Sequence, residues 1–183
     1  MCREEKLILF LWLLMTAAVS LYVSVGSYMS HRKYIHEVQQ HTPCRAIDAA
    51  HHIIKQMNEF GDAPNHLLLQ RILYHAQRDC LRKTGFPLFE DEFTLWQAGP
   101  VIPEVYRAHC VYGSRPITAR RRARLTGHAQ EFLDRYLYLE EEPSAREPVG
   151  DFYRDRPDWQ KLWDNGEGKG TRLTLEWIRE HPL

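Results

Sequence analysis

The chain has 183 residues, enough for one domain of ordinary size. Lys and Arg together number 24, as do Asp and Glu, so the formal net charge at pH 7 is zero. Such a balance argues against a nucleic-acid-binding domain, which is typically strongly basic. The four cysteines are scattered, with no Cys-x-x-Cys spacing. This argues against a disulfide framework or zinc finger, and fits a reducing compartment.

The N-terminal part contains an uncharged, mostly apolar run from Leu7 to Ser30. As a helix, this run would span about 30 Å or slightly more at roughly 1.5 Å per residue, which matches the hydrocarbon core of a bilayer. Tyr22 and Tyr28 lie toward its end, where aromatic rings favour the interface. We therefore expect a single-pass transmembrane helix that contacts the membrane through residues 7–29.

The apolar run divides the chain into three expected parts: a transmembrane anchor over residues 1–30, a juxtamembrane stalk over 31–44, and a helical domain over 45–183. Basic residues after the run slightly outnumber those before it, so the positive-inside rule predicts a cytoplasmic C-terminal domain. A cleaved signal peptide is the open alternative, because a small-x-small site occurs at residues 24–26.

Two helices are expected at the start of the domain. Thr42 and Pro43 suit the cap and first turn of a helix over about 45–60, which has apolar residues at spacings of three and four. Asn65 can cap a second helix that runs to about Lys83.

The middle of the chain is expected to be less regular. The aromatic and β-branched segment from Phe93 to Trp96 predicts a short strand, and Gly99-Pro100 predicts a turn. A short helix should follow from Pro103 to about Cys110, and a turn at Tyr112-Gly-Ser. Residues 119–141 read as one long helix with an apolar stripe.

Shorter elements are expected at the end of the chain. Small helices are predicted at about 149–154 and 157–163, and a flexible turn at 165–170. Thr171 can cap a last helix that runs to about His181. The predicted fold is mainly α: a compact multi-helix domain with at most a short strand pair, preceded by one transmembrane helix.

Three blocks of sequence in the middle of the chain carry a family resemblance. They are Leu69–Gln77 (LQRILYHAQ), Gly85–Phe89 (GFPLF), and Trp96–Tyr106 (WQAGPVIPEVY), the last followed by Tyr112–Ile117 (YGSRPI). In this order they resemble the Panacea (SocA-like) antitoxin domain, over core motifs at about 46–118. Two features depart from that family: the apparent N-terminal anchor, and a basic run after residue 118.

The resemblance implies a function. Panacea domains neutralise many unrelated toxins by direct binding, and at least one acts with a protease. We therefore expect a cognate toxin, encoded adjacently, as the partner. The family has no established catalytic residues, so the resemblance implies no catalytic residue, no cofactor, no metal and no enzyme activity.

The third block suggests a contact surface. Its glycine and two prolines favour a rigid corner with little conformational entropy to lose. Such a corner can be scaffold, docking edge or both, and the aromatic residues near it are of the types enriched at binding hot spots. The candidate partner-binding residues are Tyr74, Trp96, Gly99, Pro100, Val101, Pro103, Tyr106 and Tyr112.

The basic run contains Arg120, Arg121, Arg122 and Arg124, at the start of the predicted long helix. Four positive charges there oppose the helix dipole, which suggests another purpose. Contact with anionic lipid headgroups, contact with an acidic partner, and a solvated charged face all stay open. The alternative functions are a nucleic-acid-binding regulator that uses this run, or a membrane-associated adaptor.

Catalytic and metal motifs are weak. None of the ten histidines forms an His-Glu-x-x-His motif, and the adjacent His51 and His52 point about 100° apart on a helix. The glycine-rich residues 166–170 lack the spacing of a phosphate-binding loop. An enzyme would need polar groups that meet only on folding.

Overall fold

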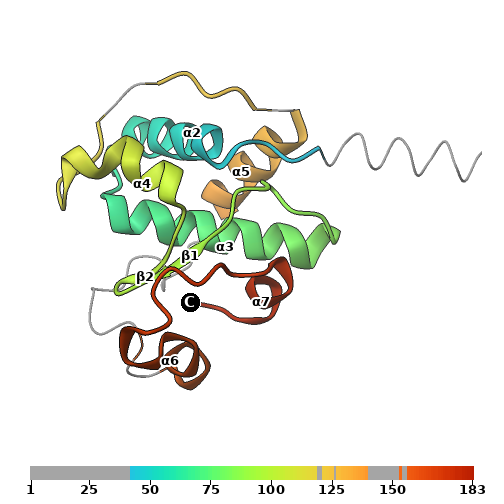
Figure 1. The fold of residues 1–183 in the computed structure, drawn as a ribbon. Helices are drawn as coiled ribbons and strands as arrows, with labels where there is room; N and C mark the ends of the chain where they lie inside the picture. Colours follow the sequence, from blue (N-terminus) through green and yellow to red (C-terminus); the bar gives the residue numbers. More distant parts are fainter. Residues whose placement is uncertain (1–41, 119–120, 126, 140–152, 154–155) are drawn as a thin grey trace, which may run out of the picture. The chain divides into compact units, whose positions relative to one another are not determined.

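The computed structural model describes residues 42–118, 121–125, 127–139, 153 and 156–183 (Figure 1). Within them the fold is mainly helical with one two-stranded sheet, as the sequence predicts. In chain order the elements are α2 (Ala46–Glu59), α3 (His66–Thr84), β1 (Thr94–Trp96), β2 (Gly99–Val101), α4 (Pro103–His109), the 3-10 turn η1 (Cys110–Tyr112), α5 (Gly127–Leu139), α6 (Pro157–Trp163), the 3-10 turn η3 (Asp164–Gly166) and α7 (Leu175–Glu180).

Several predictions fall outside the described residues. The expected transmembrane anchor lies there, as does nearly all of the stalk, and so do most of the helix predicted at 149–154 and the last two residues of the helix predicted to end at 141. None of the helices that the structure does describe has both the length and the apolar character needed to cross a bilayer.

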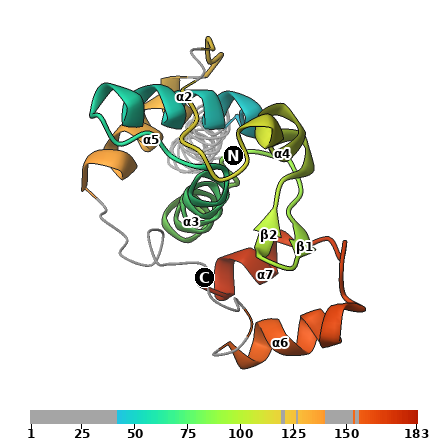
Figure 2. The same ribbon diagram turned by 90° about the vertical axis from the view of Figure 1, so that its left-hand side faces the viewer.

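Helix α3 is the centre of the domain. Seen nearly end-on in Figure 2, it lies between α2 and α5 on one side and β2 and α7 on the other, and it contacts all four. Every residue from Leu69 to Gln77 is buried, so this helix is covered on all its faces. The stretch includes polar side chains, which must find hydrogen-bond partners inside the protein.

The amide of Gln77 holds the Gly85–Phe89 block against α3. Its Oε1 accepts hydrogen bonds from the backbone N–H groups of Leu88 (2.9 Å) and Phe89 (3.2 Å). Its Nε2 donates to the carbonyl of Phe89 at 2.9 Å. Gln77 is fully buried, so one side chain satisfies three backbone groups that have no access to water.

Two more side chains on the same helix hold other loops. The Oε1 atom of Gln70 accepts from the N–H of Ile102 at 2.9 Å, which fixes the Gly-Pro-Val-Ile-Pro corner. The hydroxyl of Tyr74 donates to the carbonyl of His181 at 2.8 Å, which fixes the segment after α7. The three sequence blocks of the family resemblance are therefore joined to one another through α3.

The sheet corrects one prediction. The strand predicted at Phe93–Trp96 is confirmed, but the turn predicted at Gly99-Pro100 is wrong, because these residues begin β2 and Trp96 lies opposite Gly99. Gly99 has a φ of +109°, which favours glycine at the end of this tight hairpin. Pro100 is tolerated because Leu95, opposite it, directs its own N–H and carbonyl to residues 170–171 on the other side.

Two predicted helix caps are also wrong. Residues 170–173 pair with β1, so Thr171 is part of an extended segment, and Thr174 caps α7 by accepting from the N–H of Trp177 at 3.1 Å. The N–H of Ala46 at the start of α2 is bonded by the carboxylate of Asp91 (2.7 Å) and not by Thr42. The Asn65 cap is confirmed by the hydrogen bond that its side chain accepts from the N–H of residue 68, at 2.8 Å.

The predicted long helix begins later than expected. Helix α5 starts at Gly127, and residues 121–125 are irregular. The N–H of Arg124 donates to the Asp48 carboxylate of α2 at 2.8 Å, so it is not available for a helical hydrogen bond. Arg121, Arg122 and Arg124 therefore precede the helix and do not form its first turn.

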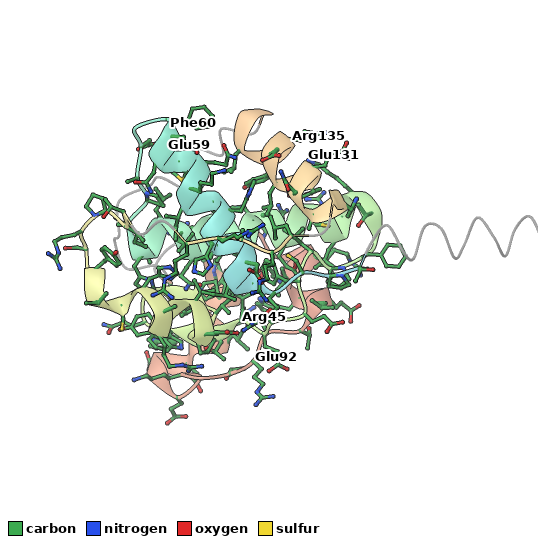
Figure 3. The ribbon with its side chains drawn as sticks, turned by 90° about the horizontal axis from the view of Figure 1, so that it is seen from above. Arg45, Glu59, Phe60, Glu92, Glu131 and Arg135 are labelled. Carbon is green, nitrogen blue, oxygen red and sulfur yellow. The ribbon has the colours of Figure 1, made fainter. Side chains whose placement is uncertain are left out.

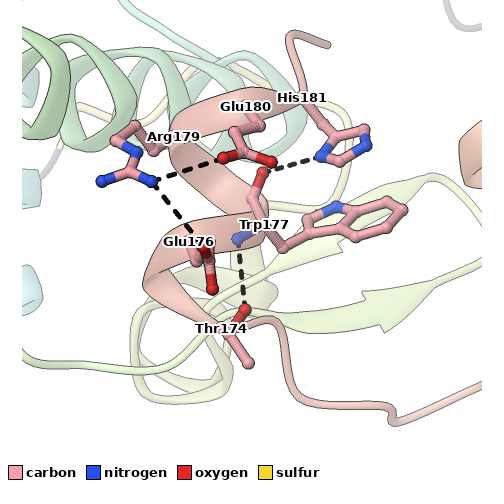
Figure 4. A network of polar contacts seen from close by, with 6 residues as sticks. All are labelled: Thr174, Glu176, Trp177, Arg179, Glu180 and His181. Carbon is pink, nitrogen blue, oxygen red and sulfur yellow. Dashed lines mark hydrogen bonds and ion pairs between the residues drawn. The ribbon is translucent and has the colours of Figure 1, made fainter.

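The end of the chain is held by local contacts around α7 (Figure 4). Beyond the Thr174 cap, the rings of Trp177 and His181 stack with centroids 3.7 Å apart. The indole N–H of Trp159 donates to the carbonyl of Pro182 at 3.0 Å. These contacts position the backbone of residues 181–182 against Tyr74 on α3.

Replacing Gln77 with leucine should destabilise the domain. Two N–H groups and one carbonyl would lose their partner inside the core, and each unsatisfied group costs about 1–3 kcal/mol. We expect the free energy of unfolding in urea to fall by at least about 2 kcal/mol. The matched control Gln160→Leu, at an exposed site on α6, should change it by less than about 0.5 kcal/mol. Equal effects of the two substitutions would contradict the role given to Gln77.

Candidate partner-binding site

Half of the predicted contact residues lie in the core. Tyr74 has no exposed surface and Val101 is 4% exposed, while Gly99 and Pro100 are also buried. The structure therefore moves these four from the expected surface to the scaffold. The burial of Gly99, Pro100 and Val101 supports the scaffold interpretation of the corner.

The other four candidates are partly exposed, and two of them meet. The rings of Trp96 on β1 and Tyr106 on α4 lie 4.7 Å apart, and the ring of His66 contacts Tyr106 edge-on at 4.6 Å. This small aromatic surface carries residue types that dominate binding energy at interfaces. Pro103 opens α4, and Tyr112 lies beyond its other end in η1.

A histidine cluster that sequence reasoning did not identify lies beside this aromatic surface. His51 of α2 and His109 of α4 contact edge-on with ring centroids 5.6 Å apart. The Nδ1 atom of His109 is 3.0 Å from the carbonyl of Val105 and must donate to it, because a carbonyl only accepts. Each histidine of this group, including His66 of α3, has one buried ring nitrogen that finds no hydrogen-bond partner among the described residues.

The environment of these histidines favours their neutral form. Burial is the main cause that lowers the pKa of His51, His66 and His109 below the ordinary value of 6.5. His109 further lowers the pKa of the other two, and the positive charge of Arg121 lowers that of His51 and His109. The cluster joins three helices, so no local spacing in the sequence could reveal it.

A surface cavity lies between α2, the arginine segment (residues 121–125) and α5. Its volume is about 620 Å3. At its edge, the Nε2 atom of His52 on α2 lies 2.6 Å from the Asp134 carboxylate on α5 and ties the two helices together. We call this cavity the basic groove. Its lining residues are His52, Lys55, Gln56, Asn58, Glu59, Arg121, Arg122, Ala123, Leu125 and Gln130.

The sequence-predicted arginines are only partly in this groove. Arg121 and Arg122 line it, while Arg124 is exposed beside α2 and Arg120 lies outside the described residues. The α2 residues that form the opposite wall were not among the predicted site residues. The structure brings these α2 residues to the arginines because the arginine segment passes across α2 (Figure 1).

The described residues offer little for metal or thiol chemistry. Within the part of the chain that the structure describes, no three His, Cys, Asp or Glu side chains are grouped so as to hold a metal ion. Cys44 and Cys80 are buried and unpaired. Burial raises the pKa of Cys44 to about 12 and also raises the pKa of Cys80, so both thiols stay protonated.

The fold and the groove together describe a small helical scaffold with a polar binding surface. Residues 69–146 match the family of the antitoxin SocA-like, Panacea domain. The match begins at Leu69, the first residue of the Leu69–Gln77 block. It continues across α5, whereas the sequence motifs end at about residue 118. Helix α2 precedes it. No curated protein and no solved structure matches the chain.

The family match has a functional meaning. The match to a SocA-like antitoxin domain suggests an antitoxin function and a non-enzymatic role. It is consistent with a toxin as the partner.

The histidine cluster predicts a stability that depends on pH. The folded-state pKa values lie below 6.5, so the unfolded chain binds protons more readily than the folded chain. The stabilisation is complete above pH 6.5 and is lost as the pH falls from there toward the lowered values.

We expect the free energy of unfolding to decrease between about pH 7 and pH 5, as measured by urea denaturation in a series of buffers. The double variant His51→Gln/His109→Gln should show a shallower decrease over the same interval. The comparison concerns the slopes, so any constant loss of packing in the variant cancels. An unchanged slope would refute the assignment to this cluster.

Proposed function

We propose that this protein neutralises a cognate toxin by direct protein–protein binding while tethered to the membrane. The observation that carries the proposal is the match of residues 69–146 to the SocA-like antitoxin domain. The motifs of that match are the segments that Gln70 and Gln77 join to α3, so the shared sequence encodes a rigid scaffold. A rigid scaffold binds with little entropy loss, which suits a protein that works by holding another.

The scaffold offers two surfaces for this role. One is the aromatic surface formed by Trp96, Tyr106 and His66, where large rings are held in place by one another. The other is the basic groove. The two kinds of surface complement each other, because aromatic anchors supply affinity and charged groups supply orientation and association rate.

The membrane tether rests on the apolar run at residues 7–30. No charged residue interrupts it, and its length fits a bilayer. A tether would concentrate the domain where a membrane-directed toxin acts, which raises the effective concentration of the binding surface. The slight excess of basic residues after the run favours a cytoplasmic domain.

Co-expression tests the antitoxin role. The open reading frames on either side of this gene are induced one at a time, with and without the full-length chain. We expect one of them to stop growth when expressed alone, and growth to recover when the chain is present. A variant that unfolds, such as one with Gln77→Leu combined with Gln70→Leu, serves as the negative control. The antitoxin role is rejected if no neighbouring product is toxic, or if toxicity persists with the chain present.

Cell fractionation tests the tether separately. The full-length chain should sediment with membranes after a carbonate wash, and deletion of residues 1–30 should move it to the soluble fraction. Mass spectrometry of the N-terminus distinguishes the alternatives, because a cleaved signal peptide would give a soluble chain that begins near Ser27. That result would remove the tether from the proposal and leave toxin binding intact.

A further inference from the structure

Two hydrogen bonds from α2 hold the chain that carries Arg121 and Arg122, one before these arginines in the sequence and one after them. Near one end of α2, the Nδ2 atom of Asn58 donates to the carbonyl of the buried Ile117 at 2.9 Å. Near the other end, Asp48 accepts from the N–H of Arg124 at 2.8 Å. The two bonded residues therefore follow α2 in reverse order, with Ile117 near its C-terminal end and Arg124 near its N-terminal end. Arg121 and Arg122, which lie between the two hydrogen bonds, are held beside the helix although their segment has no regular structure.

The groove beneath this segment has an excess of positive charge. Lys55, Arg121 and Arg122 line it. Among the described lining residues Glu59 is the one carboxylate, 3.8 Å from Lys55, and the Asp134 carboxylate at the edge is bonded to His52. The start of α5 lies at the same site, and the N-terminus of a helix carries a partial positive charge.

Arg121 and Arg122 are both exposed. Within the residues that the structure describes, neither has an ion-pair partner. Several other exposed arginines do, among them Arg45 and Arg135, which are labelled in Figure 3, whereas others such as Arg107 have none within the described residues. The paired examples are Arg135 with Glu131, Arg172 with Glu92, and Arg45 with Glu104.

Uncharged lining residues complete the site. The amides of Gln56 and Gln130 can donate and accept hydrogen bonds, and Leu125 and Ala123 add an apolar part. A guanidinium binds a carboxylate through two parallel hydrogen bonds, and the amides and apolar side chains can contact a polypeptide backbone and its neighbours. The groove therefore has the chemistry that recognises a short acidic segment of a protein.

We infer that the basic groove is the docking site for an acidic segment of the protein partner. This inference rests on the proposed function, since the partner is the toxin, and it adds where the toxin binds and which chemistry is recognised. A nucleic acid fits less well, because affinity for a phosphate backbone grows with the number of phosphates that are neutralised, and the groove offers three cations. The zero net charge of the chain points the same way.

A charge-reversal experiment tests the inference in cells. The full-length chain is co-expressed with the toxin identified among the neighbouring products. We expect Arg121→Glu/Arg122→Glu to abolish neutralisation and Arg121→Lys/Arg122→Lys to retain most of it. The matched control is Lys161→Glu/Lys169→Glu, which makes the same change in net charge at exposed sites elsewhere and should neutralise like the wild type. Equal thermal unfolding temperatures for all variants establish that the substitutions leave the fold intact.

A binding measurement with purified toxin and purified full-length chain is the second test. Titration of the toxin into the full-length chain in detergent should show a dissociation constant at least about tenfold higher for the Glu double variant than for the wild type. Replacing acidic residues of the toxin with lysine should restore binding to that variant. Two further probes are random-sequence duplex DNA and phosphatidylcholine vesicles that contain phosphatidylglycerol. Binding of either probe that depends on these arginines, with toxin binding unchanged, would overturn the inference.

The possible failures are distinguishable. If the wild type neutralises the toxin and Arg121→Glu/Arg122→Glu does so equally well, the docking site is wrong and the antitoxin role stands. If the wild type neutralises no neighbouring product, the antitoxin role fails, and with it the acidic-toxin inference that depends on it.

Discussion

The domain depends on the hydrogen bonds that the buried amides of α3 make to loops distant in sequence. Gln77 satisfies three backbone groups of the Gly85–Phe89 block, and Gln70 satisfies the backbone at Ile102. A loop that enters a core brings polar groups that cannot reach water, and each is costly when left alone. The two amides remove that cost, so irregular segments can pack directly against a helix that is buried on all sides.

This constraint explains which residues the family match contains. Residues 69–146 include most of α3 and the two loops held by Gln70 and Gln77, whereas the segment held by Tyr74 lies outside the match. Much of the basic groove comes from α2, which lies outside the match. A scaffold fixed by interior residues leaves its outer walls free to vary, which is a physical basis for one fold serving different protein partners.

Sequence reasoning succeeded where the interacting groups are neighbours in the chain. The Asn65 cap acts three residues away, and Pro103 begins α4 through its own backbone angle. It failed where the partner is remote: Asp91 takes the capping role expected of Thr42. The histidine cluster is assembled from three helices, so no single segment signals it. The arginine run signalled one wall of the basic groove, but the α2 wall was missed because it is brought to the arginines only by folding. Spacing rules describe one helix or strand at a time, whereas these sites form only when several helices pack together.

The pairing of residues 170–173 with β1 covers a sheet edge that would otherwise be exposed. Leu95 directs its backbone groups to residues 170–171, and the N–H of Leu173 donates to the carbonyl of Phe93. A fragment trimmed to residues 69–146 would leave that row of groups unsatisfied, open to pairing with a second molecule. During synthesis the same bare edge exists until the last segments leave the ribosome. Residues 170–173 therefore cover this edge of the sheet, although they lie outside the matched residues 69–146.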